Sequence, residues 1–191
     1  MRRLVYYIAS SVDGFIADPD GGTGAFAQSP EYLAELADRF PDTFPAHVRT
    51  PLGIDGPNRQ FDTVLMGRHT YEPALQAGIT SPYPHLEQYV FSRHLAPSSK
   101  TGLHVVADDP VATVRGLKAR PGPLDLWLCG GGHLAAQLLP ELDELIVKLN
   151  PVVLGSGIPL FAGVAVMPLT LVEQQPLHGG VVLLRYHRAQ S

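Results

Sequence analysis

Short apolar runs, each followed by a segment with helical spacing, alternate along the first two thirds of the sequence. The runs that we interpret as β-strands are Arg3–Ser11, Phe61–Met66, Gln88–Ser92, Leu103–Ala107, Leu124–Cys129, Leu142–Asn150, Leu169–Gln175 and Gly180–His187. Helices are predicted at Arg68–Leu75 and Gly132–Leu139, and from Pro30 and Pro110 onward, where apolar residues recur at helical spacing. Such alternation is typical of a parallel sheet covered by helices. The sequence therefore predicts an α/β fold.

The last part of the chain breaks this alternation. Gly179 and Gly180 separate two β-rich runs that have no helical segment between them. Consecutive strands joined by a short turn pair in antiparallel orientation. We therefore expect a mixed, mostly parallel sheet, flanked by helices, that ends in a C-terminal antiparallel hairpin.

Composition favours one globular domain and excludes several classes of protein. The 191 residues suit a single domain over 1–191, of which 45% is apolar, the usual share for a packed domain. With 14 basic and 18 acidic side chains the net charge is −4, and the basic surface that nucleic acid requires is lacking. The single cysteine, Cys129, excludes an internal disulfide and a cysteine-based zinc site. We expect no bound metal.

One long uncharged segment, from Leu149 to Val172, has the length of a membrane span. Pro151, Pro159 and Pro168 interrupt it, and a helix there would lose hydrogen bonds that lipid does not replace. The basic start of the chain leads into a run with two tyrosines, which we interpret as a strand rather than a signal peptide. We therefore expect a cytoplasmic protein without membrane contact.

The strongest motif lies at residues 126–134, where an apolar strand ends at Cys129 and continues through Gly130, Gly131 and Gly132 into a helix. Glycines let a ligand approach the backbone, and the start of a helix offers free N–H groups. This combination suits a diphosphate. A tight turn without a ligand explains the same residues equally well, since the complete dinucleotide-binding pattern is not present.

A second strand ends at Gly67 and continues into a helix whose first turn contains Arg68 and Thr70. A guanidinium group binds a phosphate monoester, and a threonine hydroxyl at a helix start binds a diphosphate. Taken alone, the motif is more simply an ordinary helix start with an arginine in solvent.

A third strand ends at Ser92 and Arg93. Phosphate-compatible groups thus follow three predicted strands. Ligands of open α/β sheets lie beyond the carboxyl ends of the strands, so these residues favour a nucleotide site there.

Four motifs, in this order, resemble those of the dihydrofolate reductase-like family: residues 9–17 (ASSVDGFIA), 66–72 (MGRHTYE), 129–132 (CGGG) and 154–161 (LGSGIPLF). Within that family the chain is most similar to the branch of the C-terminal reductase domain of the riboflavin-biosynthesis deaminase/reductase. The similarity spans nearly the whole chain. It implies a mixed sheet of about eight strands, NADPH as the cofactor and a homodimer.

The resemblance also implies a set of cofactor contacts at strand ends and in the glycine-rich segments. The nicotinamide contacts would be Ala9 and Ile16. The contacts with the adenosine phosphate, the diphosphate and the riboses would be Gly67, Arg68, Thr70, Ser92, Arg93, Gly130, Gly131, Gly132, His133 and Leu134. The family commonly has a cis peptide bond at the position of Gly130-Gly131.

The implied activity is hydride transfer from NADPH to a heterocyclic or ribosylated pyrimidine-type substrate, as in 5-amino-6-(5-phosphoribosylamino)uracil reductase. The substrate would lie between residues 12–17, the helix that begins at Pro30 and the 155–161 loop. Gly157 and Phe161 are candidate contacts in that loop. Asp13 is a candidate catalytic or substrate-binding residue, and capping of main-chain amides is its alternative role.

Two other functions remain open. A dihydrofolate reductase would need a carboxylic acid from the first helix, where Glu31, Glu35 and Asp38 are the candidates. The apolar face of that helix directs none of them clearly inward, so a solvated face is the better interpretation. The other alternative is a nucleotide-binding module without turnover.

Residues 41–60 are rich in proline and glycine and lack periodicity. Connections of this length seldom lack a role. We interpret the segment as a loop insertion, either an active-site flap or a mobile connection.

Overall fold

The computed structural model describes residues 1–189 and contains one large sheet and one small one. The strands of the eight-stranded sheet are β1 (Leu4–Ser10), β3 (Phe61–Gly67), β4 (Glu87–Phe91), β5 (Leu103–Val106), β6 (Asp125–Gly130), β7 (Glu144–Leu149), β9 (Leu169–Pro176) and β10 (Val182–Arg188). The second sheet pairs β2 (Phe15–Ala17) with β8 (Ile158–Pro159). The helices are α1 (Pro30–Arg39), α2 (Ala46–Arg49), α3 (Arg68–Gln76), α4 (Pro110–Ala119) and α5 (Gly132–Gln137). None of the helices in this part of the chain is long and apolar enough to cross a bilayer.

The strand order is β5-β4-β3-β6-β1-β7-β10-β9. All neighbours from β5 to β7 run parallel, whereas β10 is antiparallel to both β7 and β9. The α/β class, the mixed sheet and the C-terminal antiparallel strands are therefore confirmed. The small β2–β8 sheet was not predicted, because strands of three and two residues are too short to show a period.

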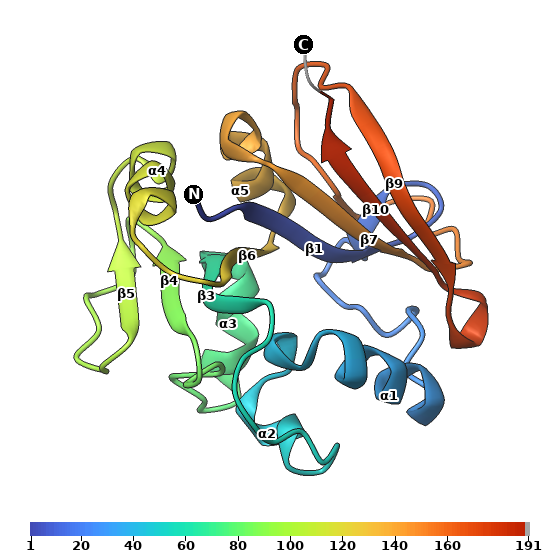
Figure 1. Cartoon of the computed structure of the whole chain (residues 1–191), viewed down its shortest axis with the longest axis horizontal. Helices are drawn as coiled ribbons and strands as arrows, with labels where there is room; N and C mark the ends of the chain where they lie inside the picture. Colours follow the sequence, from blue (N-terminus) through green and yellow to red (C-terminus); the bar gives the residue numbers. More distant parts are fainter. Residues whose placement is uncertain (190–191) are drawn as a thin grey trace.

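Helices cover both faces of the large sheet, with α1 and α2 on one side and α4 and α5 on the other (Figure 1). Side chains alternate along a strand, so β1 directs Val5 and Tyr7 toward α1 but Leu4 and Tyr6 toward α5. Below we call these sides the α1 face and the α5 face. Burial on both faces explains why the strands have continuous apolar sequences.

Two helix starts are capped by side chains. Ser29 Oγ accepts a hydrogen bond from Tyr32 N at 3.3 Å, and Pro30 occupies the first turn of α1. Asp109 Oδ1 accepts from Val111 N at 2.9 Å at the start of α4. Each cap satisfies an amide that the helix itself leaves free.

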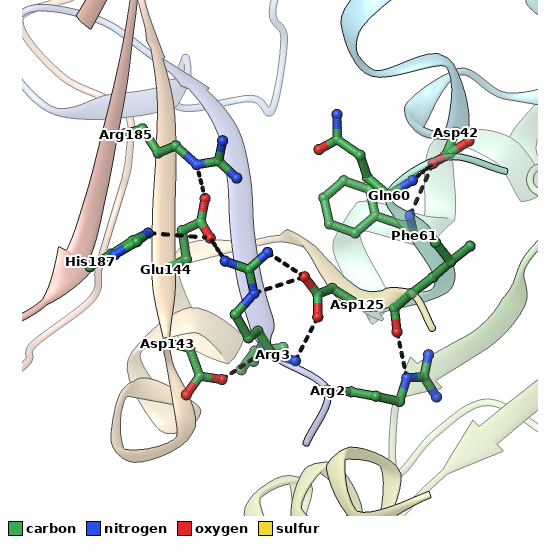
Figure 2. Close-up of polar contacts among 12 residues, drawn as sticks. Arg2, Arg3, Asp42, Gln60, Phe61, Asp125, Asp143, Glu144, Arg185 and His187 are labelled. Carbon is green, nitrogen blue, oxygen red and sulfur yellow. Dashed lines mark hydrogen bonds and ion pairs between the residues drawn. The ribbon is translucent and has the colours of Figure 1, made fainter. Parts of the chain in front are cut away.

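The 41–60 segment contains more structure than its sequence suggests, namely a 3-10 turn, η1 (Pro41–Thr43), and α2. The buried carboxylate of Asp42 accepts the amides of three consecutive residues, Arg59, Gln60 and Phe61, at 2.7–3.0 Å. Figure 2 shows the contacts with Gln60 and Phe61. A buried carboxylate is tolerated when it is hydrogen-bonded in this way. The two ends of the segment are thereby fastened together.

A network of ion pairs connects the amino ends of the parallel strands (Figure 2). Glu144, fully buried in β7, forms ion pairs with Arg3 at 2.7 Å and with Arg185 of β10. Arg3 also pairs with Asp125 at the start of β6, at 2.6 Å. These charges lie at the end of the sheet opposite the predicted nucleotide motifs, so they join strands rather than line the candidate site.

Candidate functional site

The carboxyl ends of β4, β3 and β6 lie side by side, because these strands are parallel neighbours in the sheet. The strand register pairs Gly67 with Phe91 and Met66 with Gly130. A Cβ atom built on Gly67 would lie 3.5 Å from Gly130 O and 3.7 Å from Gly131 N. The fold thus brings together the three strand ends that sequence analysis singled out.

Gly131 lies where the β2 segment and α3 converge. A Cβ atom built on it would be 3.7 Å from Ile16 Cδ1 and 3.7 Å from Thr70 Oγ1. The Gly130-Gly131 peptide bond is cis, as the resemblance implied. Ile16, Thr70 and the two glycines therefore form one surface at the end of β6.

Two other glycines are required by packing. A Cβ atom on Gly132 would lie 2.1 Å from Pro159 O, and one on Gly157 would lie 2.1 Å from Ala17 O. Neither clash is compatible with a side chain. Gly132 lets β8 approach the start of α5, and Gly157 lets the segment before β8 approach β2. The glycine pattern alone did not distinguish this packing requirement from ligand contact.

The phosphate-compatible side chains are exposed at this edge to different degrees. Arg68 is partly exposed and forms an ion pair with Glu72 at 3.0 Å, whereas Arg93 is exposed. Ser92 is buried, and its Oγ accepts the amides of His94 and Leu95 at 3.2 and 3.1 Å. Arg68 and Arg93 are therefore the candidate cations for an anionic ligand at this edge.

The two remaining predicted contacts, both on α5, differ in exposure. His133 is exposed, whereas the Leu134 side chain is buried in the core of the α5 face. Leu134 can reach a ligand only through its main chain.

A cleft of about 340 Å³ opens on the α1 face, next to the strand ends. Residues from β1, β6, β7, the β2 segment, the 23–28 loop, α1, the 43–45 turn and the approach to β4 line it. They are Tyr7, Ile8, Ala9, Ile16, Thr23, Phe26, Ala27, Gln28, Tyr32, Leu33, Leu36, Thr43, Phe44, Pro45, Tyr83, Trp127, Cys129 and Lys148. The proposed nicotinamide contacts, Ala9 and Ile16, are thus in the wall of one mostly apolar cleft.

Lys148 is the charged residue of the cleft, and sequence analysis did not single it out. It lies in β7 opposite Ala9 of β1, and its Nζ is 4.1 Å from the centroid of the Tyr7 ring. Burial lowers the pKa of Lys148 to about 8, because desolvation disfavours the charged form. A lysine within the apolar run 145–149 was the available signal, and it was hidden because the run was interpreted only as a strand.

The other polar groups of the cleft are neutral. Burial raises the pKa of the Cys129 thiol to about 12 and the pKa of Tyr7 well above its ordinary value. The buried Tyr7 hydroxyl has no hydrogen-bond partner within residues 1–189. Buried hydroxyls are nearly always paired, so a polar group of a ligand would complete this site.

The acids of α1 do not line the cleft. Glu31 and Asp38 are exposed, and Glu35 accepts hydrogen bonds from His178 N and Nδ1 at 3.0 and 2.6 Å. This arrangement agrees with the solvated face that the sequence predicted.

Asp13 holds the neighbouring loop. Its carboxylate accepts the amides of Leu154 and Gly155 at 3.1 and 2.7 Å. Hydrogen bonding from Ser11 and from these amides lowers the Asp13 pKa to about 2. The geometry favours the capping role over that of a proton donor.

Phe161 packs edge-on against Tyr6, with ring centroids 5.5 Å apart, in the core of the α5 face. Neither Phe161 nor Gly157 is among the residues that line the cleft.

Comparisons with known proteins give the family. A model described as the RibD C-terminal domain matches residues 2–183. The uncharacterized protein YwjB of Bacillus subtilis (strain 168) is 32% identical over 192 residues, which cover 98% of this chain and 99% of YwjB. The uncharacterized protein YyaP of the same strain is 27% identical over 200 residues, covering 97% and 95% of the two chains.

Solved structures share the fold. A putative riboflavin biosynthesis protein from Shewanella sp. PV-4 has a TM-score of 0.70 and 21% identity over the whole of both chains. A diaminohydroxyphosphoribosylaminopyrimidine deaminase/5-amino-6-(5-phosphoribosylamino)uracil reductase from Thermotoga maritima has a TM-score of 0.65 and 16% identity, covering 98% of this chain and 57% of that one. Dihydrofolate reductase from Enterococcus faecalis, complexed with NADP(H) and RAB-propyl, has a TM-score of 0.62 and 15% identity, covering 98% and 97%.

These matches confirm the dihydrofolate reductase-like fold and the branch to which the four motifs pointed. The family model covers nearly the whole chain, and the sheet order agrees with the fold that the motifs implied. The chain therefore belongs to the RibD C-terminal domain family.

Proposed function

We propose that this protein is an NADPH-dependent reductase that acts on a heterocyclic or ribosylated pyrimidine-type substrate. The observation that carries the proposal is the junction of two surfaces. The strand ends of β4, β3 and β6 adjoin a cleft of about 340 Å³ whose wall contains Ala9 and Ile16. A dinucleotide has both a polyanionic part and a flat ring, and these two surfaces suit the two parts.

The residues present fit such a cofactor. Arg68 and Arg93 would hold its 2′-phosphate, while Thr70 and the main chain of Gly130 and Gly131 would bind the diphosphate. The bare surface of Gly131 beneath Ile16 and Thr70 leaves room for close approach. When bound, the reduced nicotinamide supplies a hydride.

The cleft then selects the acceptor. Its lining is aromatic and aliphatic, with one cation, so it suits a planar ring that has electronegative substituents. The reductase from Thermotoga maritima carries 5-amino-6-(5-phosphoribosylamino)uracil in its name, and a substrate of that kind is the one we propose to test first.

A dihydrofolate reductase is the weaker candidate, because no carboxylate of α1 lines the cleft. The homodimer and the cytoplasmic location stay predictions. Sedimentation of the purified protein would test the first of them.

The test is turnover. Purified protein is incubated with NADPH and either 5-amino-6-(5-phosphoribosylamino)uracil or dihydrofolate, and the products are identified by mass spectrometry. We expect the uracil compound to gain two hydrogens while NADPH is consumed. NADPH binding without reduction of either compound would favour the non-catalytic binding module instead.

A further inference from the structure

Lys148 lies in the wall of the cleft and is partly exposed, in an unusual position for a cation. It is paired across the sheet with Ala9 of β1 and Leu183 of β10, and its Nζ lies over the Tyr7 ring. A cation over an aromatic face gains some attraction, but much less than it loses on leaving water.

The ammonium group has no polar partner. Within residues 1–189, no carboxylate forms an ion pair with Lys148 and no hydrogen bond engages its Nζ, and it is the one charged side chain among the residues that line the cleft. Lys118, which is buried, pairs with Asp143 at 2.6 Å and donates to Glu141 O at 2.9 Å. The fold therefore satisfies one buried lysine and leaves the other facing the cleft.

We propose that Lys148 is the proton donor of the reaction and binds the substrate heteroatom that gains negative charge. This inference rests on the proposed function. The acceptor carbon of a C=O or C=N bond gains the hydride, and the π electron pair moves to the oxygen or nitrogen. Lys148 Nζ gives that atom a proton and is left as a neutral amine, which solvent reprotonates. The substrate is thus reduced by two electrons and two hydrogens, and the dihydronicotinamide is oxidised.

Lys148 is the group of the cleft lining whose charge changes near neutral pH. The titratable groups that face it are Tyr7 of β1, Cys129 of β6, Tyr32 of α1 and Tyr83 before β4. Burial raises the pKa of each of them, to about 12 for Cys129 and Tyr32 and well above the ordinary value for Tyr7 and Tyr83. Of these groups only Lys148, with its pKa near 8, changes charge near neutral pH.

The test compares Lys148→Met with the exposed control Lys100→Met. Methionine replaces the aliphatic stem of the lysine side chain and removes the ammonium group, so most of the packing is retained. Both variants are titrated calorimetrically with NADPH, and the rate of reduction of 5-amino-6-(5-phosphoribosylamino)uracil is measured from about pH 6 to about pH 11, a range that brackets an ordinary and a lowered lysine pKa.

We expect Lys148→Met to bind NADPH within about threefold of wild type and to reduce the substrate at least about 100-fold more slowly, as for the loss of a general acid. The wild-type rate should fall as pH rises through about 8, and the residual rate of the variant should not. Lys100→Met should match wild type in all respects.

A second readout needs no cofactor. The lysines of the chain are Lys100, Lys118 and Lys148, so NMR of protein labelled with 13C at lysine Cε resolves them, and the variants assign the signals. We expect the Lys148 signal to titrate near pH 8 and to shift when the uracil compound is added, while that of Lys100 stays in place.

The outcomes separate the two proposals. If wild type reduces the substrate and Lys148→Met does so within threefold with the same pH profile, the role of Lys148 is overturned and the reductase stands. If wild type does not bind NADPH, the proposed function fails first. NADPH binding without reduction, or an unshifted Lys148 signal, also overturns the inference, because no substrate then meets the ammonium group.

Discussion

The two faces of the sheet are built from the same strands but differ in how completely their groups are satisfied. On the α5 face, Leu138 is fully buried and the buried Lys118 has two polar partners. On the α1 face, a cleft opens between the strands and part of α1, the buried Tyr7 hydroxyl has no hydrogen-bond partner within residues 1–189, and the partly exposed Lys148 forms no ion pair there. Closed packing stabilises a fold, whereas unsatisfied groups persist where a ligand completes them. The comparison favours the α1 face as the side on which the proposed ligands bind.

Leucine truncation should give the largest contrast in stability between the faces. Leu138→Ala leaves a cavity in a closed core, and we expect a loss of about 3–4 kcal/mol. Leu36 borders the existing cleft, where the loss should be about 2 kcal/mol, the low end for such changes. Urea denaturation measures both values.

NADPH binding and turnover should also differ between leucine variants on the two faces. Leu138→Ala, while folded, should bind NADPH as wild type does, whereas Leu36→Ala changes the shape of the cleft and should alter turnover. A larger loss of stability for Leu36→Ala than for Leu138→Ala would contradict the distinction between an open and a closed face.

Arg68→Ala tests the strand-end surface beside the cleft. If the guanidinium binds the 2′-phosphate, the variant should weaken NADPH binding by about 1.5–3 kcal/mol, as for a charge-assisted hydrogen bond. NADH lacks that phosphate, so its binding should hardly change. Calorimetry with both cofactors measures the difference, and equal losses would remove the assigned role.

Lys148→Met should give the smallest change in stability. It should stabilise the fold, whereas the leucine truncations destabilise it. The folded protein lowers the pKa of Lys148 from 10.5 to about 8, so between these values the unfolded chain binds more protons. The contribution of this group to stability therefore rises with pH from about 8 to 10.5, and below pH 8 the folded protein bears the full cost.

The pKa difference corresponds to roughly 3 kcal/mol at most, which partial access to water reduces to about 1–2 kcal/mol. The variant should be more stable than wild type by that amount at pH 7, and the gain should vanish near pH 10.5. Denaturant titrations at both pH values check this, with Lys100→Met as the control. A gain independent of pH would show that packing, and not charge, is the cause.

The sequence predicted the strands of the large sheet and most of its helices, because burial on both faces imposes long apolar runs and the caps at Ser29 and Asp109 mark helix starts. It also identified the strand ends at Gly67 and Gly130, since glycine followed by a helix is a local pattern. Features that depend on distant contacts were not predictable. Asp42 acts on amides 17–19 residues away.

Distant contacts also limited what the sequence could predict of the candidate site. The close approach of Pro159 O to Gly132 makes a packing glycine look like a ligand-binding one. Lys148 was not singled out, because residues 142–150 were interpreted only as a strand and the fold was needed to show that this lysine lines the cleft.

The central claim is that the strand ends and the α1-face cleft together bind NADPH. Calorimetric titration of purified, folded protein with NADPH and, separately, with NADH tests it most directly. We predict saturable binding of NADPH with a clear preference over NADH. Absence of binding to either nucleotide would contradict the account.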